Sequence, residues 1–217
     1  MDKPEGWTSH DVVAKVRNIL SKQADRKIRV GHAGTLDPLA TGLLLLLTGN
    51  YTKKAGEFSK LDKTYQAKAK LGETSTTGDR EGEKTQVNTK KPTVKTVKSV
   101  LASFIGESMQ TPPAYSAVKV KGQRAYKLAR QGKEVSLKQR RITIYDISEI
   151  NYKYPHISFM VKVSSGTYIR SLAGDIGEKL GTGAYLESLK RTQINGFFLK
   201  NAVKPEEASV KNLLTSI

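Results

Sequence analysis

The sequence predicts an α+β fold, because segments with strand-like and helix-like spacing follow one another without a regular strand-helix-strand order. Alternating apolar residues predict strands over residues 65–71, 141–150 and 156–163. Apolar residues at helical spacing predict helices that begin near residue 9, within 92–106 and within 169–180. Neither an internal repeat nor an interdomain linker is visible, so we expect one domain over residues 1–217.

The first third of the chain is predicted to contain a helix, a buried strand and, over residues 65–71, a half-buried strand. Thr8 or Ser9 is expected to cap the helix, and its apolar face is formed by Val12, Val13, Val16, Ile19 and Leu20. The apolar run 42–48 lies between glycines and predicts a strand buried on both faces, with a helical segment as the alternative. The polar, glycine-rich stretch 72–84 predicts a loop.

The rest of the chain, from residue 92 onward, is predicted to form two longer helices with a basic segment between them. The helical stripe within 92–106 ends at Gly106. Residues 111–141 are rich in Lys, Arg, Gln and Tyr, and we interpret them as a basic excursion from the core with one short helix at 125–129. The helix within 169–180 closes at Gly181, and a second short helix is expected over 184–189.

Composition restricts the classes of partner and cofactor. The chain has 37 Lys and Arg against 20 Asp and Glu, a net charge of +17, which favours RNA as the partner over an anionic membrane surface. Without cysteine, disulfides and thiolate metal sites are excluded, and the three histidines show no metal spacing. The five leucines of 43–47 are too few to span a bilayer, and no signal-peptide pattern opens the chain, so we expect a cytoplasmic protein without metal, ATP or nicotinamide.

Asp37 is the first candidate for chemistry. It lies in "GHAGTLDPLATGLLLLLTG" (31–49), between small residues and directly before Pro38. An Asp before Pro is commonly a turn residue. However, Pro38 also restricts the residue before it, and a rigid, partly desolvated carboxylate serves as a nucleophile or general base if a cation keeps it ionised.

Arg170 is the candidate partner for that carboxylate. It stands in the first turn of a predicted helix in "SSGTYIRSLAGDIG" (164–177), where the helix dipole disfavours a cation. This position indicates a carboxylate or phosphate partner, although an exposed Arg is the plain alternative. Tyr168 lies two residues away, and Tyr65 starts the alternating strand, where it is either core or a base-stacking residue. His32 between two glycines is structural or a wedge that stacks on nucleobases.

Basic residues gather within 119–141, interleaved with Tyr115 and Tyr126. Such a mixture suits contact with an RNA backbone, whereas a solvated loop is the plain alternative. The whole-chain charge favours RNA. The members of this set are Lys119, Lys121, Arg124, Lys127, Arg130, Lys133, Lys138, Arg140 and Arg141.

Five stretches together resemble the TruB family of tRNA pseudouridine synthases, in its order and spacing over nearly the whole chain. They are "DKPEGWTSHDVV" (2–13), "GHAGTLDPLATGLLLLLTG" (31–49), "DKTYQAKAKLG" (62–72), "PPAYSAVKVKGQRAYKLARQG" (112–132) and "SSGTYIRSLAGDIGEKLGTGAYLESLKRT" (164–192). The resemblance implies a pseudouridine synthase fold, a mixed, mostly antiparallel sheet flanked by helices, with a thumb-like insertion at about 111–141. It also implies that the family's small C-terminal RNA-binding domain is absent.

The resemblance implies isomerisation of uridine to pseudouridine at position 55 in the T-loop of tRNA, by base flipping, without cofactor or metal. Asp37 matches the catalytic aspartate, Tyr65 the tyrosine that stacks on the target base, and Arg170 the arginine that pairs with the aspartate. The matching RNA-contacting residues are His32, Tyr168, Leu189, Lys119, Arg124, Arg130 and Arg141.

Three alternatives stay open at this point. The first is a relative that modifies other RNAs through a guide RNA and protein partners. The second is a tRNA-folding chaperone, and the third is a basic structural protein of ribosomal type. The resemblance favours a stand-alone monomeric enzyme that contacts the tRNA T-arm and needs no protein partner.

Overall fold

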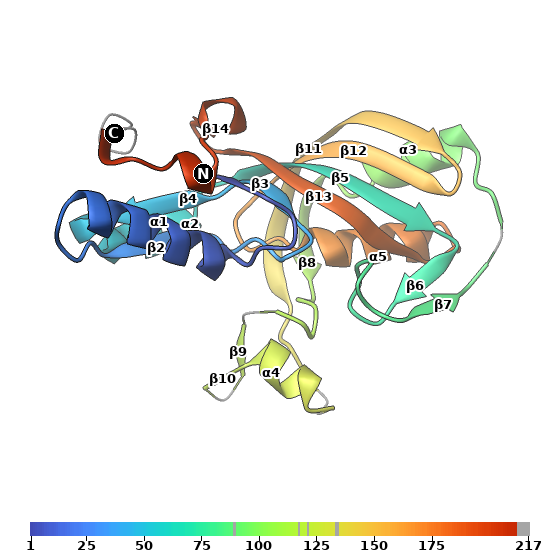
Figure 1. Ribbon diagram of the computed structural model, residues 1–217. Coiled ribbons are helices and arrows are strands. Elements are labelled where there is room, and N and C mark those ends of the chain that lie inside the picture. The colour runs from blue at the N-terminus through green and yellow to red at the C-terminus, as the bar shows by residue number, and fades with distance from the viewer. Residues whose placement is uncertain (89, 117, 121, 133–134, 212–217) are drawn as a thin grey trace. The chain divides into compact units, whose positions relative to one another are not determined.

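The computed structural model describes residues 1–88, 90–116, 118–120, 122–132 and 135–211 (Figure 1). The chain divides into two compact units, which we describe separately. The terminal unit comprises Met1–Tyr65 and Leu189–Ile217, and the central unit comprises Gln66–Ser188. Strands β5 (Lys63–Leu71) and β13 (Ala184–Ile194) each contribute residues to both units.

In the terminal unit, helix α1 (Ser9–Gln23) packs against strand β2 (Val30–Ala33). Thr8 caps the helix: its hydroxyl accepts the N–H of Asp11, and the Asp11 carboxylate accepts the N–H of Thr8. This reciprocal cap satisfies two backbone donors that have no partner inside the helix. The predicted apolar face is confirmed, since Val12, Val13, Val16 and Leu20 are buried.

The remaining elements of the terminal unit are short. They are β1 (Asp2–Lys3), β3 (Thr41–Leu43), β4 (Leu45–Thr48), η1 (Gly49–Lys54), α2 (Ala55–Ser59), β14 (Phe197–Phe198), η2 (Leu199–Asn201) and η3 (Pro205–Glu207). β3 pairs antiparallel with β1 and parallel with β13, and β14 pairs antiparallel with β13. β2 and β4 form a separate antiparallel pair.

The prediction of one strand over 42–48 is corrected to two strands. β3 and β4 have different partners, and Leu44 stands between them in neither strand. Its N–H donates to the carbonyl of Met1 at 2.8 Å, and its own carbonyl accepts from the Met1 amino group at 3.0 Å. This change of partner could not be predicted from the apolar run, because leucines occur in both strands.

In the central unit, β13, β5, β12 (His156–Val163), β11 (Arg140–Lys153) and β8 (Gly106–Gln110) are neighbours in that order. β11 pairs antiparallel with both β12 and β8. Helix α3 (Val94–Ala102) packs on β11 and on helix α5 (Ile169–Lys179). The α+β class with mostly antiparallel pairing is therefore confirmed, and none of the described helices is long and apolar enough to cross a membrane.

Two predictions in the central unit are wrong. The predicted loop 72–84 contains β6 (Glu73–Ser75), which forms a hairpin with β7 (Lys84–Gln86). The predicted helix over 184–189 is the start of β13. Here the backbone of Ala184 runs so close to α5 that a Cβ on Gly177 would lie 2.2 Å from the Ala184 nitrogen. Tertiary packing thus selects an extended chain where the apolar spacing is also compatible with a helix.

The basic excursion between β8 and β11 is confirmed as a separate small substructure of the central unit. It contains the hairpin β9 (Lys119–Val120) and β10 (Gln123–Arg124), followed by helix α4 (Ala125–Arg130). Figure 1 shows these elements extending away from the strands to which they are joined. The short helix predicted near 125–129 is therefore also confirmed.

Candidate active site

Asp37 lies in the segment between β2 and β3 of the terminal unit and is half-buried. Its carbonyl accepts the N–H of Ala40 at 3.0 Å, which closes a turn with Pro38 in the second position. The carbonyl of Pro38 in turn accepts the N–H of Gly6 at 2.9 Å. The backbone that follows the carboxylate is therefore held by two hydrogen bonds.

The backbone before Asp37 is held by a buried serine. The hydroxyl of Ser9, in the first turn of α1, donates to the carbonyl of Leu36 at 3.1 Å and accepts the N–H of Leu36 at 2.8 Å. Ser9 is 2% exposed, so water does not compete for these bonds. Both polar backbone groups of the residue before Asp37 are thus satisfied, and the backbone of Asp37 is held on both sides.

A buried lysine reaches the same loop. Lys3 is fully buried, and its ammonium donates to the carbonyls of Pro4 at 2.9 Å, Trp7 at 2.6 Å and Pro38 at 3.3 Å. Burial lowers the pKa of Lys3 to about 8, and the negative charge of Asp37 is the largest influence that opposes this shift. Asp37 and Lys3 therefore interact electrostatically, which favours the ionised carboxylate.

Two further cations are buried in the terminal unit. Arg191 of β13 donates from Nε to the carbonyl of Leu43 at 2.7 Å and from Nη2 to the carbonyl of Gly34 at 2.9 Å. Lys63 of β5 donates to the backbone carbonyls of Ser59 and Leu61. Burial and, to a smaller extent, the nearby charge of Arg191 lower the pKa of Lys63 to about 8. The Asp37 loop is thus bordered by positive charge.

The sequence analysis assigned no role in the active site to Ser9, Lys3, Lys63 or Arg191. For Lys63 a signal was present, because it occupies an inward-facing position of the alternating strand, where an apolar residue is expected. A cation in that register indicates a buried partner. Ser9 carried no such signal, since a serine at a helix start is fully explained as a cap.

The other predicted site residues of the terminal unit lie on strands. Tyr65 of β5 is 8% exposed, as expected for an inward-facing residue. His32 stands in β2 opposite Leu46 of β4, and Leu189 is half-buried in β13. His32 and Asp37 therefore occupy one short stretch of chain, whereas Tyr168 and Arg170 belong to the central unit.

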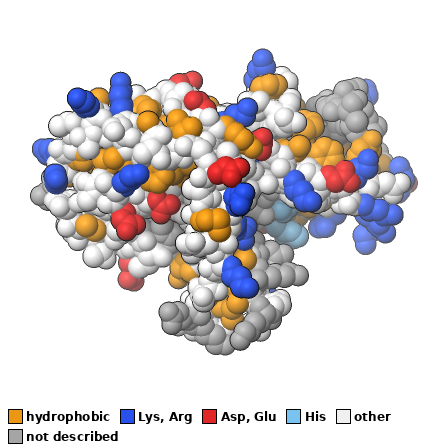
Figure 2. Space-filling model, turned by 180° about the vertical axis from the view of Figure 1, so that it is seen from behind, with side chains coloured by type: hydrophobic (Ala, Val, Ile, Leu, Met, Phe, Trp, Pro, Cys, Tyr) orange, Lys and Arg blue, Asp and Glu red, His pale blue; other side chains and the backbone are white. Residues whose placement is uncertain are grey.

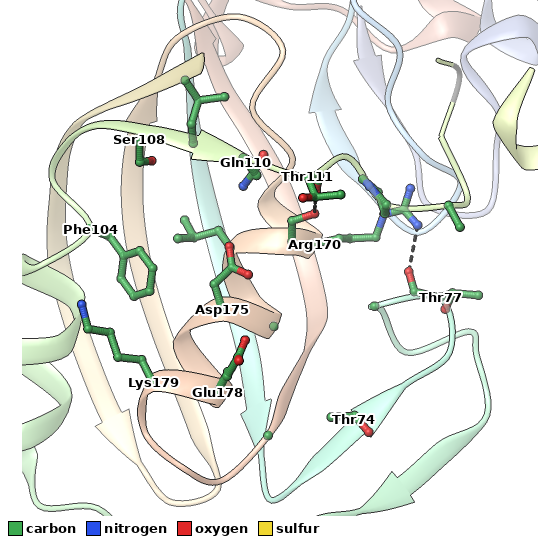
Figure 3. A pocket seen from close by; sticks show the side chains of 18 of the residues that line it. Thr74, Thr77, Phe104, Ser108, Gln110, Thr111, Arg170, Asp175, Glu178 and Lys179 are labelled. Carbon is green, nitrogen blue, oxygen red and sulfur yellow. Dashed lines mark hydrogen bonds between the residues drawn. The ribbon is translucent and has the colours of Figure 1, made fainter. Parts of the chain in front are cut away.

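Arg170 is the second residue of α5 and is only 7% exposed. Its Nη1 lies 3.3 Å from Oδ2 of Asp79 and donates to the carbonyl of Thr77 at 3.0 Å (Figure 3). Its Nη2 donates to the carbonyl of Tyr115 at 2.7 Å. Asp79, from the region that was predicted to be a loop, is thus one carboxylate partner of Arg170, and the predicted pairing of Arg170 with Asp37 stays a prediction.

Asp79 is itself almost fully buried and well bonded. Its Oδ1 accepts the hydroxyl of Thr77 at 2.6 Å and the N–H of Glu81 at 3.0 Å. The ion pair and these two bonds connect the start of α5 to the β6–β7 hairpin. Such a geometry fixes the guanidinium in one orientation.

Tyr168 precedes α5 and is held by Gln110, the last residue of β8. The Gln110 side chain accepts the N–H of Tyr168 at 2.8 Å and donates to the Tyr168 carbonyl at 3.1 Å. The guanidinium of Arg140 lies 5.8 Å from the centre of the Tyr168 ring, within cation–π distance. The ring is thus positioned by two neighbouring strands.

The central unit also contains a cavity of about 1130 Å³, which sequence reasoning did not foresee. Asp175, Glu178 and Lys179 of α5 border it together with Gln110 and Thr111 (Figure 3). Burial raises the pKa of Asp175, and the nearby charge of Glu178 raises it further. In the described part of the chain, no three His, Asp or Glu side chains are grouped as metal ligands.

The predicted RNA-contacting cations are spread over the basic excursion. Lys119 lies in β9, Arg124 in β10 and Arg130 at the end of α4, and their side chains lie outside the described part of the structure. Arg141 of β11 is exposed and forms a 3.4 Å ion pair with Glu107. Figure 2 shows blue Lys and Arg side chains distributed over much of the visible face.

Solved structures of similar fold define the class of protein. A chain in a crystal structure of a Cbf5–Nop10–Gar1 complex has a TM-score of 0.69 and 29% identity, over 93% of this chain and 50% of that one. A chain in the structure of an H/ACA RNP bound to a substrate RNA containing 2′-deoxyuridine has a TM-score of 0.65 and 27% identity. This similarity covers 93% of this chain and 49% of that one. The chain spans about half the length of these solved chains. The expected pseudouridine synthase fold is confirmed by the first of these similarities together with the family match below.

The family follows from the sequence comparisons. The model of the TruB family pseudouridylate synthase N-terminal domain matches residues 17–169. The tRNA pseudouridine synthase B of Parabacteroides distasonis is 47% identical, over 95% of this chain and 88% of its own length. The tRNA pseudouridine synthase B of Thermosipho melanesiensis is 46% identical, over 99% of this chain and 69% of its own length. The chain is thus a pseudouridine synthase, an isomerase, and it belongs to the TruB family.

Proposed function

We propose that this enzyme isomerises uridine to pseudouridine at position 55 in the T-loop of tRNA. The observation that carries the proposal is the held backbone at Asp37, fixed by Ser9 through Leu36 and by the turn to Ala40, with the buried Lys3 in electrostatic contact. A carboxylate on a rigid backbone is suited to attack and to leave in one catalytic cycle. The names of the most similar relatives support tRNA as the substrate.

The reaction breaks the N1–C1′ glycosidic bond, rotates the uracil and forms a C5–C1′ bond, and C5 loses a proton while N1 takes one up. Asp37 is the proposed catalytic group. It adds to C1′ of the ribose, adds to C6 of the base, or assists a glycal route. No cofactor is needed, because the isomerisation involves no net oxidation or reduction.

Five further residues complete the proposed site. Tyr65 stacks on the target base and takes part in removal of the C5 proton, and Arg170 forms the cationic partner of the Asp37 carboxylate. The target uridine must be flipped out to be reached, and His32 fills the space that it leaves. Tyr168 and Leu189 line the pocket for the flipped base.

The basic excursion is proposed to contact the tRNA T-arm through Lys119, Arg124, Arg130 and Arg141. These cations suit the phosphates of a folded loop, which is recognised by shape and by splayed bases. We propose that residues 1–217 act as one catalytic domain, as a cytoplasmic monomer without an obligatory protein partner.

Two other activities are compatible with particular observations. The solved structures of similar fold include a Cbf5–Nop10–Gar1 complex and an H/ACA RNP, so a guide-RNA-dependent relative is the alternative enzyme. The excess of cations on the basic excursion also suits a chaperone that opens folded tRNA. Activity of the isolated chain on a bare T-arm distinguishes the proposed enzyme from both.

The test is tritium release from an unmodified T-arm stem-loop labelled at C5 of its uridines, for the wild type beside Asp37→Asn. We expect stoichiometric release by the wild type and a rate about 10⁴-fold lower for the variant, with unchanged binding of the stem-loop. A variant close to wild type would contradict the role of Asp37. Binding without release by the wild type would favour a chaperone or a partner-dependent enzyme.

A further inference from the structure

Arg191 contacts both ends of the chain segment that contains Asp37. Its Nε donates to the carbonyl of Leu43, which follows Asp37, at 2.7 Å, and its Nη2 donates to the carbonyl of Gly34, which precedes it, at 2.9 Å. The residue is 1% exposed. One planar side chain therefore fixes the spacing between the two ends of the loop.

The burial of Arg191 needs a reason beyond stability. In the described part of the chain its guanidinium forms no ion pair, although a buried charge is costly without a carboxylate partner. Its positive charge also adds to the lowering of the Lys3 and Lys63 pKa values. An apolar residue would avoid these costs, but it would leave the carbonyls of Gly34 and Leu43 without these donors.

The strand that carries Arg191 is held against the loop by an unusually close approach. β13 pairs in parallel with β3, with Arg191 opposite Gly42. Gly42 has a φ of +95°, and a Cβ at this position would lie 2.4 Å from the Arg191 carbonyl oxygen. The backbone of Arg191 is thus fixed beside the end of the loop, and its side chain extends to the beginning.

We propose that Arg191 is a positioning residue for the reaction, which sets the place of the Asp37 carboxylate by holding Gly34 and Leu43 at once. This inference rests on the proposed function, because it assumes that Asp37 is the catalytic group. Only the fork of a guanidinium supplies two rigid donors to two carbonyls, whereas a lysine provides a single flexible point charge. Leu189 of the proposed uridine pocket lies on the same strand, so β13 would place the pocket wall and the carboxylate together.

The test compares Arg191→Lys and Arg191→Met with the wild type, and Lys190→Met serves as the matched control. Lys190 is the exposed neighbour on the same strand, opposite Thr41, so its replacement removes a cation and neither of the two side-chain hydrogen bonds to Gly34 and Leu43. Tritium release is measured in a single turnover with saturating enzyme, where the rate constant does not depend on an unfolded fraction. Hydrogen exchange at the amides of Leu36 and Ala40 reports on the loop itself.

We expect Arg191→Lys to lower the single-turnover rate constant about 10- to 100-fold, since a misplacement of about 1 Å costs about that much. The Kd for the stem-loop should change less than about twofold, and both amides should exchange faster. Lys190→Met should match the wild type in all three measurements. This pattern would separate positioning from a general loss of folded protein.

Three results would overturn the inference. They are a wild-type rate constant in Arg191→Lys, unchanged exchange at Leu36 and Ala40, and failure of both Arg191 variants to fold, which would make the role purely structural. If the wild type itself releases no tritium, the proposed function is wrong. In that case the exchange of the two amides still decides whether Arg191 holds the loop.

Discussion

At the scale of single residues, the ion pair between Arg170 and Asp79 shows how this protein uses buried charge. Both side chains are almost fully removed from water, and each has further hydrogen bonds to the loop that contains Thr77. Desolvation offsets most of the attraction in such a pair, so its net stabilisation is small. What it provides is one fixed orientation of the guanidinium.

Removing one partner of this pair should lower the free energy of unfolding by much more than the net stabilisation that the intact pair provides. Asp79→Ala removes the carboxylate that pairs with the buried Arg170 at 3.3 Å, and we expect the free energy of unfolding to fall by about 3–5 kcal/mol. Urea titration followed by circular dichroism measures this change.

Glu107→Gln is the matched control for Asp79→Ala, because it breaks the Arg141–Glu107 pair at nearly the same distance but on the surface. Exposed pairs contribute little, so we expect a change below about 0.5 kcal/mol. Equal losses in the two variants would contradict the interpretation that burial decides the cost.

The candidate site could be predicted from the sequence only in part. Asp37 and Tyr65 follow from local signals, namely a proline and an alternating strand, whereas their roles stay predictions. The kind of partner that Arg170 needs was also predictable, because a cation in a first helical turn requires an anion. That Asp79 forms a pair with Arg170 was not, since nothing local relates residues so distant in the chain.

At the scale of elements, the contact between α5 and β13 depends on one glycine. Gly177 of α5 faces the backbone of Ala184, and a Cβ there would lie 2.2 Å from the Ala184 nitrogen. Gly174 of the same helix has no heavy atom within 4 Å of a Cβ position. The helix therefore contains one glycine, Gly177, at a close backbone contact, and one glycine, Gly174, that faces open space.

These two glycines should respond to alanine in opposite directions. Gly177→Ala must push β13 away from α5, and we expect a loss of at least about 2 kcal/mol in the free energy of unfolding. Gly174→Ala should stabilise the protein by up to about 1 kcal/mol, because alanine favours the helix. Thermal unfolding of both variants measures the difference, and a stabilised Gly177→Ala would disprove the close approach.

Elements with regularly spaced apolar residues could be predicted from the sequence. Elements whose conformation depends on packing against other elements could not. The strand over 156–163 was predicted with the bounds that the structure shows, because its burial alternates throughout. The start of β13 was predicted as a helix, since Ala184, Tyr185 and Leu186 are all buried and show no alternation. Its extended form is set by its pairing and by Gly177, which only the folded chain brings together.

At the scale of the whole molecule, the net charge of +17 is the property most relevant to RNA. Each phosphate neutralised by the protein releases counterions, so affinity for RNA should fall steeply as salt increases. Four of the cations within 119–141, namely Lys119, Arg124, Arg130 and Arg141, are the residues proposed to contribute most. Further Lys and Arg side chains are scattered over much of the face shown in Figure 2.

Replacing Lys119, Arg124, Arg130 and Arg141 together by Gln should therefore reduce the salt dependence of binding. We expect the slope of log Kd against log salt concentration to fall by about 3, because each phosphate that the protein no longer neutralises lowers the slope by about 0.7–0.9. Fluorescence anisotropy of a labelled T-arm stem-loop over a series of salt concentrations measures this slope.

The control for this prediction removes the same charge elsewhere. Lys15, Lys22, Lys95 and Lys98 are exposed on α1 and α3, and their replacement by Gln lowers the net charge equally. We expect the slope to change by less than about 1, because screening limits distant charges. Equal effects of both sets would show that only total charge matters.

The connection between Arg191 and Gly34 also has a consequence for the time course of biosynthesis. The two residues are separated by 157 positions, and the central unit between them is one uninterrupted segment. A growing chain therefore carries Asp37 from early on but receives the side chain that secures its loop only after the whole central unit has been synthesised. Domains fold as units while the chain emerges, so the central unit has all its residues before the terminal unit does. A polypeptide released before Arg191 would keep the catalytic aspartate and lack the two hydrogen bonds that hold its loop.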